Sequence, residues 1–220
     1  KALDIYFTAL KSAEKEKDST HIGLLINNIA NIYEDMNESD KALSLYQKSL
    51  EIKKIHGTFI QIINAYFNVA NLQLEIGEKE NDSLLIVKSK RNYDKVLEIS
   101  REKKYGNGRL IGWEGLGRIA LHYLDYKKSE TYFKRILNEV KSTPNKPYLN
   151  MATLSLAHIK VQEKKYYQAE CYLLNVKVFI EKSGTIKQKK QLFENLSLVY
   201  QNKKQYKKAY EYLIKLKTIE

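Results

Sequence analysis

The stretch WEGLGRIALHYLDYKKSETYFKRIL, residues 113–137, decides the fold of this chain. Apolar residues recur at helical spacing on both sides of a short break at residues 124–126. A small residue lies inside each run, Gly117 before the break and Ser129 after it. Small side chains at facing positions let two helices approach closely, so the stretch predicts a helix–turn–helix unit.

Small residues at these two positions recur along the whole chain. The first series is Ala30, Ala70, Gly117, Ala157 and Ser197, and the second is Ala2, Ala42, Ser89, Ser129, Ala169 and Ala209. Their spacings are 40, 47, 40 and 40 in the first series and 40, 47, 40, 40 and 40 in the second. The two series lie 12 residues apart in four units and 19 apart in one, so a single insertion of seven residues explains every departure from the 40-residue period.

The composition excludes several classes of protein. With 9 Gly and 2 Pro in 220 residues the chain has few turn formers, which argues against an all-β domain. Its apolar content of 43% and aromatic content of 11% argue against disorder. The chain has no run of about 18 apolar residues, so no transmembrane segment is predicted. Its single cysteine excludes an internal disulfide.

The net charge of +12 is concentrated in one half of the chain. Residues 1–110 carry 17 Lys and Arg against 16 Asp and Glu, whereas residues 111–220 carry 21 against 10. Of the 38 basic residues 33 are Lys, and nucleic-acid binders rely on Arg for bidentate contacts, so nucleic acid is disfavoured as a partner. Lysine pairs cluster at the expected turns: Lys127-Lys128, Lys164-Lys165, Lys203-Lys204 and Lys207-Lys208. They predict a basic edge, either a solvated rim or a salt-dependent docking site for an acidic partner.

The residues around the small positions resemble the tetratricopeptide repeat, a helix–turn–helix motif. The third unit carries the clearest match: Trp113, Leu116, Gly117, Ala120, Leu124-Asp125-Tyr126, Ser129, Phe133 and Ile136-Leu137. The second and fourth units are degenerate, with Gln73 and Lys160 where a large apolar residue is usual. The resemblance implies an all-α fold, a right-handed α-solenoid of about eleven helices with a period of about 40 residues.

On this resemblance residues 1–220 form a single array. Residues 1–16 are expected to be the second helix of a truncated unit, followed by units at about 23–56, 63–105, 110–143, 150–183 and 190–220. The seven inserted residues lie between Gly77 and Ser89 and are expected to lengthen the second helix of that unit, with Asn81 or Asp82 as its N-cap. The chain starts at Lys1 without an initiator Met or a signal peptide, which suggests a fragment or a mature product.

Five glycines fall within twelve residues, directly after the insertion: Gly106, Gly108, Gly112, Gly115 and Gly117. The repeat motif explains only Gly117. Gly112 and Gly115 should each cost about 1 kcal/mol inside a helix. They indicate either a close crossing against the long helix of the second unit, or a hinge or close approach of a ligand.

No catalytic pattern is present: the chain lacks HExxH, P-loop, GxSxG and CxxC motifs. Cys171 occupies an outward polar position of its helix and is expected to be a bystander thiol. The four histidines have no metal-ligand spacing, although His122 and His158 are expected on the inner face of adjacent units. We therefore predict a non-catalytic protein without a metal or cofactor.

The first helices of the stacked units are expected to line a concave groove that binds a protein or peptide segment. The candidate binding residues in this groove are Asn27, Asn31, Asn64, Phe67, Asn68, Asn71, Glu114, Arg118, His122 and His158. A row of asparagines can hydrogen-bond an extended peptide backbone whatever its sequence, because each amide donates and accepts. The alternative is that 16 Asn in the chain reflect codon usage and are merely solvated.

Some tetratricopeptide domains grip the C-terminal carboxylate of a peptide with Lys, Asn and Arg side chains. The matching positions are Asn27, Asn31, Asn68, Arg118 and His122. Asn27 and His122 depart from that pattern because they remove permanent positive charge, which argues against such a clamp.

The repeat style resembles the sensor regions of bacterial signalling proteins, which precede a histidine kinase or a helix-turn-helix output domain. The resemblance implies a ligand- or partner-sensing module, facing the periplasm in the kinase case. A second resemblance is to cytoplasmic receptors for secreted signalling peptides. The alternative from another class is a structural scaffold or a self-association module.

Overall fold

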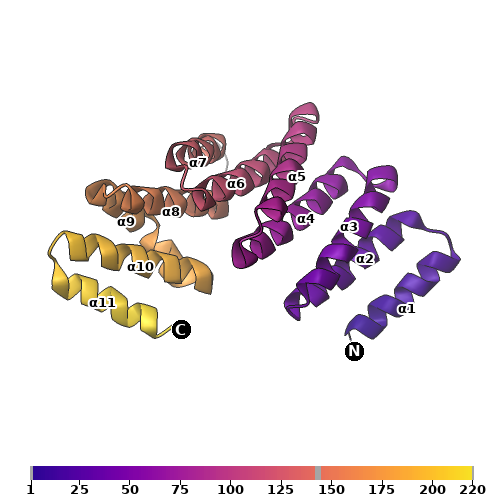
Figure 1. Ribbon diagram of the computed structural model, residues 1–220, viewed down its shortest axis with the longest axis horizontal. Helices are drawn as coiled ribbons and strands as arrows, with labels where there is room; N and C mark the ends of the chain where they lie inside the picture. The colour runs from indigo at the N-terminus through magenta and orange to yellow at the C-terminus, as the bar shows by residue number, and fades with distance from the viewer. Residues whose placement is uncertain (1, 142–144, 220) are drawn as a thin grey trace. The chain divides into compact units, whose positions relative to one another are not determined.

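A computed structural model describes residues 2–141 and 145–219 of the chain (Figure 1). Within these residues the fold is entirely helical, as predicted, with eleven α-helices and no strand. The helices are α1 (Ala2–Lys15), α2 (Ser19–Asp35), α3 (Ser39–His56), α4 (Phe59–Glu80), α5 (Ser83–Glu102), α6 (Gly106–His122), α7 (Tyr126–Val140), α8 (Lys146–Gln162), α9 (Tyr166–Ser183), α10 (Ile186–Asn202) and α11 (Tyr206–Lys217). None of the described helices is both long and apolar enough to cross a membrane.

The chain divides into two compact units, Lys1–Ile119 and Ala120–Glu220, and the boundary falls inside α6. In the first unit α1, α2, α3, α4 and α5 pack in chain order, each against the next. In the second unit α7 packs on α8, α8 on α9, α9 on α10 and α10 on α11, and α8 also contacts α10. The charge follows this division, because the second unit carries 20 Lys and Arg against 9 Asp and Glu, a net charge of +11.

Apart from the exposed Ala2, the small residues of the two series lie buried where paired helices meet. Ala30 of α2 and Ala42 of α3 have no exposed surface, and neither do Ala157 of α8 and Ala169 of α9. In the α4–α5 pair the Ser89 hydroxyl donates a hydrogen bond of 2.7 Å to the carbonyl of Ala70. The close contact predicted from the small-residue spacing is therefore present in these helix pairs.

The seven-residue insertion is distributed differently from the prediction, which placed it in the second helix of the unit. After Ala70, α4 continues for ten residues, whereas α2 continues for only five after Ala30. The turn then shortens by one residue, and α5 gains three residues before Ser89. Of the two candidates Asp82 is the N-cap of α5, accepting from the N–H groups of Leu84 and Leu85. Asn81 instead ends α4 in a left-handed conformation.

Most turns between helices contain a residue in the left-handed region, and none of these residues is glycine. They are Lys17, Asn37, Asn81, Lys104, Leu124, Lys164 and Lys204, with φ between 52° and 60°. Glycine and asparagine tolerate this conformation best, whereas a side chain such as Leu or Lys is strained there. A repeat protein with many turns can thus contain few glycines.

The glycines of α6 make room for side chains of α5, which supports the close-packing interpretation of this cluster. A Cβ atom at Gly112 would lie 2.5 Å from Cγ of Leu97, and one at Gly115 would lie 2.2 Å from the ring of Tyr93. Tyr93 itself is almost fully buried. The ring occupies the space where any side chain at position 115 would have to fit.

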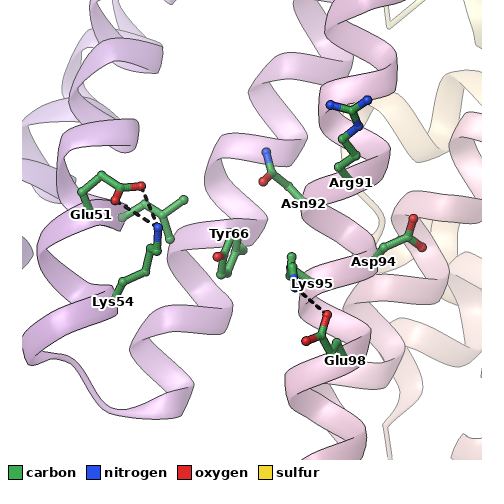
Figure 2. A pocket seen from close by; sticks show the side chains of 9 residues that line it. Glu51, Lys54, Tyr66, Arg91, Asn92, Asp94, Lys95 and Glu98 are labelled. Atoms are coloured by element: carbon green, nitrogen blue, oxygen red, sulfur yellow. Dashed lines mark hydrogen bonds and ion pairs between the residues drawn. The ribbon is translucent and has the colours of Figure 1, made fainter.

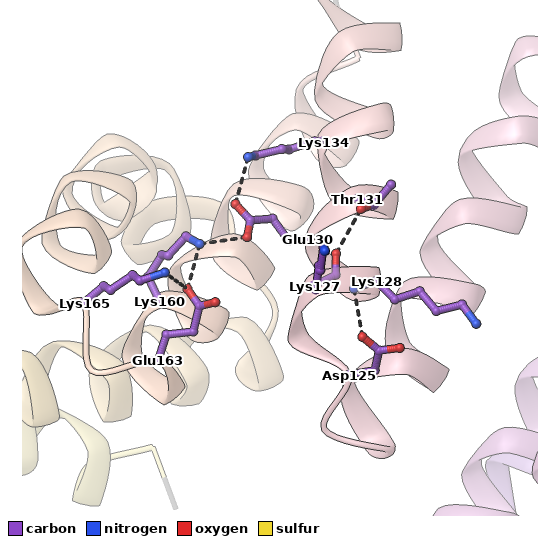
Figure 3. Close-up of polar contacts among 9 residues, drawn as sticks. All are labelled: Asp125, Lys127, Lys128, Glu130, Thr131, Lys134, Lys160, Glu163 and Lys165. Carbon is purple, nitrogen blue, oxygen red and sulfur yellow. Dashed lines mark hydrogen bonds and ion pairs between the residues drawn. The ribbon is translucent and has the colours of Figure 1, made fainter.

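The two degenerate motif positions are buried and each has a polar partner. Gln73 of α4 accepts a hydrogen bond of 2.8 Å from the amide of Asn92 on α5. Lys160 of α8 donates to Glu130 of α7 and to Glu163, both at 2.8 Å, as Figure 3 shows. Although burial opposes the charge, these hydrogen bonds raise the pKa of Lys160 above its ordinary value. Polar pairs replace apolar contacts in these two repeats.

Candidate binding site

Five of the predicted asparagines lie on α2 and α4 in the first unit, and we call their surface the amide face: Asn27, Asn31, Asn64, Asn68 and Asn71. Asn31 and Asn64 are exposed, whereas the other three are half-buried. Phe67, also on α4, is half-buried and adds an apolar side chain to the predicted set.

Asn27 and Asn68 are in direct contact although they are 41 residues apart. The amide of Asn68 donates to Oδ1 of Asn27 at 3.0 Å. The same oxygen accepts a second hydrogen bond of 3.0 Å from the ammonium group of Lys53, which reaches it from α3. Two donors from two different helices therefore converge on one amide oxygen.

The outer asparagines of the amide face have protein partners of their own. The hydroxyl of Tyr46 on α3 lies within hydrogen-bond distance of Oδ1 of Asn31 and of the Glu34 carboxylate, and it can donate its single proton to either of them. Arg118 of α6 donates to Oδ1 of Asn71 at 2.8 Å, so these two predicted residues lie together. The Asn71 amide donates in turn to Glu75 at 3.2 Å.

Carboxylates border the amide face on the side of α6. Glu78 lies 3.8 Å from the guanidinium group of Arg118. Burial raises the pKa of Tyr93, and the nearby charges of Glu114, Glu75 and Glu78 raise it further, against the opposing effect of Arg118. These three carboxylates and the Arg118 guanidinium group all lie near the ring of Tyr93.

The two predicted histidines lie in the second unit. The ring of His122 makes an edge-to-face contact with Tyr123, at 5.0 Å between ring centroids. Nδ1 of His158 lies 3.2 Å from Oδ1 of Asn195 on α10. Neither belongs to a group of metal-ligating side chains among the described residues. A groove continuing from the first helix pair to the last stays a prediction.

An open groove of about 530 Å³ lies between α3 and α5, with Tyr66 of α4 between its walls (Figure 2). Its walls carry two intrahelical ion pairs, Lys54–Glu51 on α3 and Lys95–Glu98 on α5. The remaining lining residues are Leu50, Arg91, Asn92 and Asp94. Three cationic and three anionic side chains line the groove, so their charges cancel and favour no charged ligand.

The predicted lysine edge is partly neutralised in the second unit. Lys165 lies 3.0 Å from Glu163, and Lys203 pairs with Glu170. The ammonium group of Lys208 lies 5.0 Å from the centroid of the Tyr200 ring. These contacts neutralise part of the positive charge of this edge, and its two interpretations both stay predictions. Cys171 is exposed, as expected for a thiol at an outward position.

Two family models match the chain, both described as tetratricopeptide repeat, over residues 25–56 and 191–220. Tetratricopeptide repeats are thus identified at these two segments of the chain. The crystal structure of BtubC (BKLC) from P. vanneervenii is 16% identical, with a TM-score of 0.75, over 99% of this chain and 89% of that chain. The apo form of RapI is 18% identical, with a TM-score of 0.76, over 97% of this chain and 58% of that chain. A putative kinesin light chain from Podosopora anserina with TPR-like repeats is 14% identical, with a TM-score of 0.63, over 88% of this chain and 92% of that chain.

At these identities the solved structures establish the fold alone, and no curated protein sequence matches the chain. The two matched segments indicate an interaction module, because repeats of this kind typically bind other proteins. The repeats present the amide face on the first helices of two successive units, α2 and α4.

Lys53 is the residue of this surface that the sequence analysis missed. It lies eleven residues after Ala42, and the same offset from the other small residues reaches Ala13, Ser100, Val140, Ile180 and Glu220. The first four of these are buried, and Glu220 lies outside the described residues. The sequence could have drawn attention to Lys53 because it is a lysine on the apolar stripe of its helix. Its contact with Asn27 could not be predicted, because that contact depends on packing between helices.

Proposed function

We propose that the chain binds an extended segment of a partner protein or peptide along the amide face. The observation that carries the proposal is the arrangement of Asn27, Asn31, Asn68 and Asn71 on two neighbouring helices. Asn31 is exposed, and the other three are half-buried. Amide groups pair with backbone N–H and C=O groups without selecting a side chain. The half-buried ring of Phe67 offers an apolar contact for a side chain of the segment.

The existing hydrogen bonds of the amide face leave capacity for such a ligand. The amide nitrogen of Asn31 is not used in its bond with Tyr46, in which only Oδ1 accepts. Asn64 is exposed on the same face of α4. An extended strand laid across α2 and α4 would find donors at both helices, with Arg118 and its neighbouring carboxylates at one end.

The double substitution Asn31→Ala and Asn71→Ala tests this proposal. We expect it to reduce capture of peptides from a displayed random library about tenfold or more, because one exposed and one half-buried hydrogen-bonding group are lost from the surface. The matched control replaces Asn138 and Asn175, two exposed asparagines on α7 and α9, by Ala. If both double variants capture the same peptides equally well, the amide face is not the binding surface.

We further propose, from the sequence resemblance, that this module is the ligand-sensing region of a signalling protein. A peptide selected on the amide face should then change the activity of an output domain joined to the chain, measured as autophosphorylation or DNA binding. The competing scaffold function predicts concentration-dependent self-association in sedimentation velocity, with no response to the peptide.

A further inference from the structure

The outward side of α9 carries a row of four exposed side chains, which we call the α9 stripe: Tyr167, Cys171, Leu174 and Val178. Tyr167 is 74% exposed, Leu174 46% and Val178 77%. Their spacings of four, three and four residues bring the side chains to one side of the helix, over a length of about 16 Å. The residues on the opposite side of α9 are all buried: Ala169, Leu173, Val176 and Ile180. The core therefore uses that opposite side of α9 and leaves the stripe uncovered.

The second helices of the other repeats have no comparable row in their sequences. The matching residues of α3 and α7 are all polar: Asp40, Ser44, Gln47, Glu51, Lys127, Thr131, Lys134 and Asn138. In α1, α5 and α11 a single matching residue is apolar: Phe7, Val87 and Ile214. The repeat thus does not require apolar side chains at these positions. A row of exposed apolar side chains that the fold does not need is typical of a contact surface.

The α9 stripe is complementary to a reversed copy of itself. Its spacing is that of one side of a coiled coil, in which apolar residues alternate at intervals of three and four. In an antiparallel pair of α9 helices Tyr167 lies opposite Val178, and Cys171 lies opposite Leu174, because the members of each pair are equally far from the middle of the stripe. A larger side chain then meets a smaller one at each step, and a two-fold axis relates the two copies.

The residues that flank the stripe favour the antiparallel direction. On one flank Glu170 of one copy would lie beside Lys177 of the other, and these charges are opposite. On the other flank Gln168 would lie beside Asn175, and two amides can form hydrogen bonds with each other. In a parallel pair Lys177 of one copy would instead lie beside Lys182 of the other, and these like charges would repel each other.

The present contacts of the flanking charges do not cover the stripe. Glu170 pairs with Lys203, whose ammonium group lies 4.5 Å from the centroid of the Tyr167 ring. The ammonium group of Lys177 lies 5.5 Å from the centroid of the Tyr212 ring. A carboxylate accepts several hydrogen bonds and an ammonium group donates three, so both side chains can take part in a further contact.

We propose that two copies of the chain associate through their α9 helices, which run antiparallel about a two-fold axis. The α9 stripe forms the apolar centre of the contact, and Glu170 and Lys177 of the two copies pair along one flank. A single pair of helices forms a small interface, so we expect a weak dimer with a dissociation constant in the micromolar range or above. The dimer does not depend on the proposed function, because α9 lies in the second compact unit and the amide face on α2 and α4 in the first.

Sedimentation velocity over a series of protein concentrations tests the association, with a reducing agent present to exclude a disulfide of Cys171. The double variant Leu174→Gln with Val178→Glu gives α9 the residues that α3 carries at the matching exposed positions, Gln47 and Glu51. We expect it to raise the dissociation constant about tenfold or more. The control Gln47→Glu adds a negative charge at the position of α3 that matches Leu174, and it should leave association unchanged. Circular dichroism checks that both variants are folded.

A spin label attached to Lys182→Cys, in a chain that also carries Cys171→Ala, tests the direction of the two helices. Lys182 is exposed near the end of α9. In the antiparallel pair the two labelled positions are separated by about 28 Å along the helices. In a parallel pair they would lie side by side, about 10 Å apart. Pulsed electron spin resonance measures this separation, and we expect the longer distance.

Several results would overturn the proposal. One is a wild-type protein that stays monomeric at every concentration, and another is equal association of the wild type and the Leu174→Gln, Val178→Glu variant. A short separation between the spin labels would show that the antiparallel arrangement is wrong. A monomer that binds vesicles of phosphatidylcholine and phosphatidylglycerol, and loses this binding in the double variant, would assign the stripe to a membrane surface and not to a second copy.

Discussion

Replacing the buried Lys53 by methionine should make the protein more stable at neutral pH. The ordinary pKa of a lysine is 10.5, and burial lowers the pKa of Lys53 to about 8. Each pKa unit corresponds to about 1.4 kcal/mol, so holding the charge inside the fold costs about 3 kcal/mol at pH 7. Methionine keeps the length of the stem beside Gly23 and gives up one hydrogen bond, worth about 1 kcal/mol. We therefore expect Lys53→Met to raise the free energy of unfolding by about 2 kcal/mol.

The pH dependence of the stability provides a second, independent test of this prediction. The folded-state pKa of Lys53 lies below the unfolded value, so between about pH 8 and 10.5 the unfolded chain binds more protons than the folded one. The cost of the charge therefore shrinks as pH rises through this window. The advantage of Lys53→Met should be largest at and below pH 7 and should disappear by about pH 10.

Urea unfolding followed by tryptophan fluorescence measures this difference directly. Trp113 is the single tryptophan of the chain and lies in the same unit as Lys53, so its signal reports on the affected part. The control is Lys54→Met, which removes an exposed lysine and should show neither the stabilisation nor the pH effect. A destabilised Lys53→Met at pH 7, or a stability difference that stays constant from pH 7 to pH 10, would refute the reasoning.

Three further changes test other parts of the fold by the same unfolding measurement. Gly115→Ala should destabilise the protein by about 1–3 kcal/mol, because the new methyl group would meet the ring of Tyr93 at 2.2 Å. Glu130→Gln should destabilise it by about 1–3 kcal/mol, since it leaves the buried Lys160 with fewer charged partners. Burial raises the pKa of Glu130, but the hydrogen bonds from Lys134 and Lys160 outweigh burial and lower it. The stability that the Glu130 carboxylate contributes should therefore be present above about pH 4.5 and lost as pH falls. Leu124→Gly should stabilise the protein by about 1 kcal/mol, because Leu124 is 68% exposed and has a φ of 57°.

Each of these three changes has a control elsewhere in the chain. Gly23→Ala should cost less than Gly115→Ala, because its nearest contact is 3.1 Å and not 2.2 Å. Glu98→Gln removes an exposed carboxylate and should change stability little. Lys127→Gly, inside the first turn of α7, should destabilise the protein, and a stabilising effect there would contradict the conformational argument for Leu124.

The helices and their pairing were predictable because small residues at helix contacts leave a period in the sequence. Ala30 and Ala42 mark one contact, and the same spacing recurs in three further units. The position of the insertion within its unit was not predictable, because residues 78–88 are compatible with either helix. Only the caps at Asn81 and Asp82 decide where α4 ends and α5 begins.

The sequence predicted which helix positions form the candidate site, but it did not predict which side chains contact one another there. The repeat register placed Asn27 and Asn68 on the first helices of neighbouring units, and the structure brings them to 3.0 Å. The third member, Lys53, comes from a second helix, and a Cβ atom at Gly23 of α2 would lie 3.5 Å from Cγ of its stem. Such a contact across three helices leaves no periodic signal in one sequence.

The glycines of α6 also restrict which amino-acid substitutions this chain can accept during evolution. Any single-base change of a glycine codon that alters the residue adds a side chain, and at Gly112 and Gly115 every added atom meets Leu97 or Tyr93. An acceptable replacement therefore needs a second change on α5 at the same time. Other positions of a repeat accept many residues, but in this pair of helices substitutions have to occur together. Related chains should therefore keep the two glycines and the tyrosine as a set or lose them as a set.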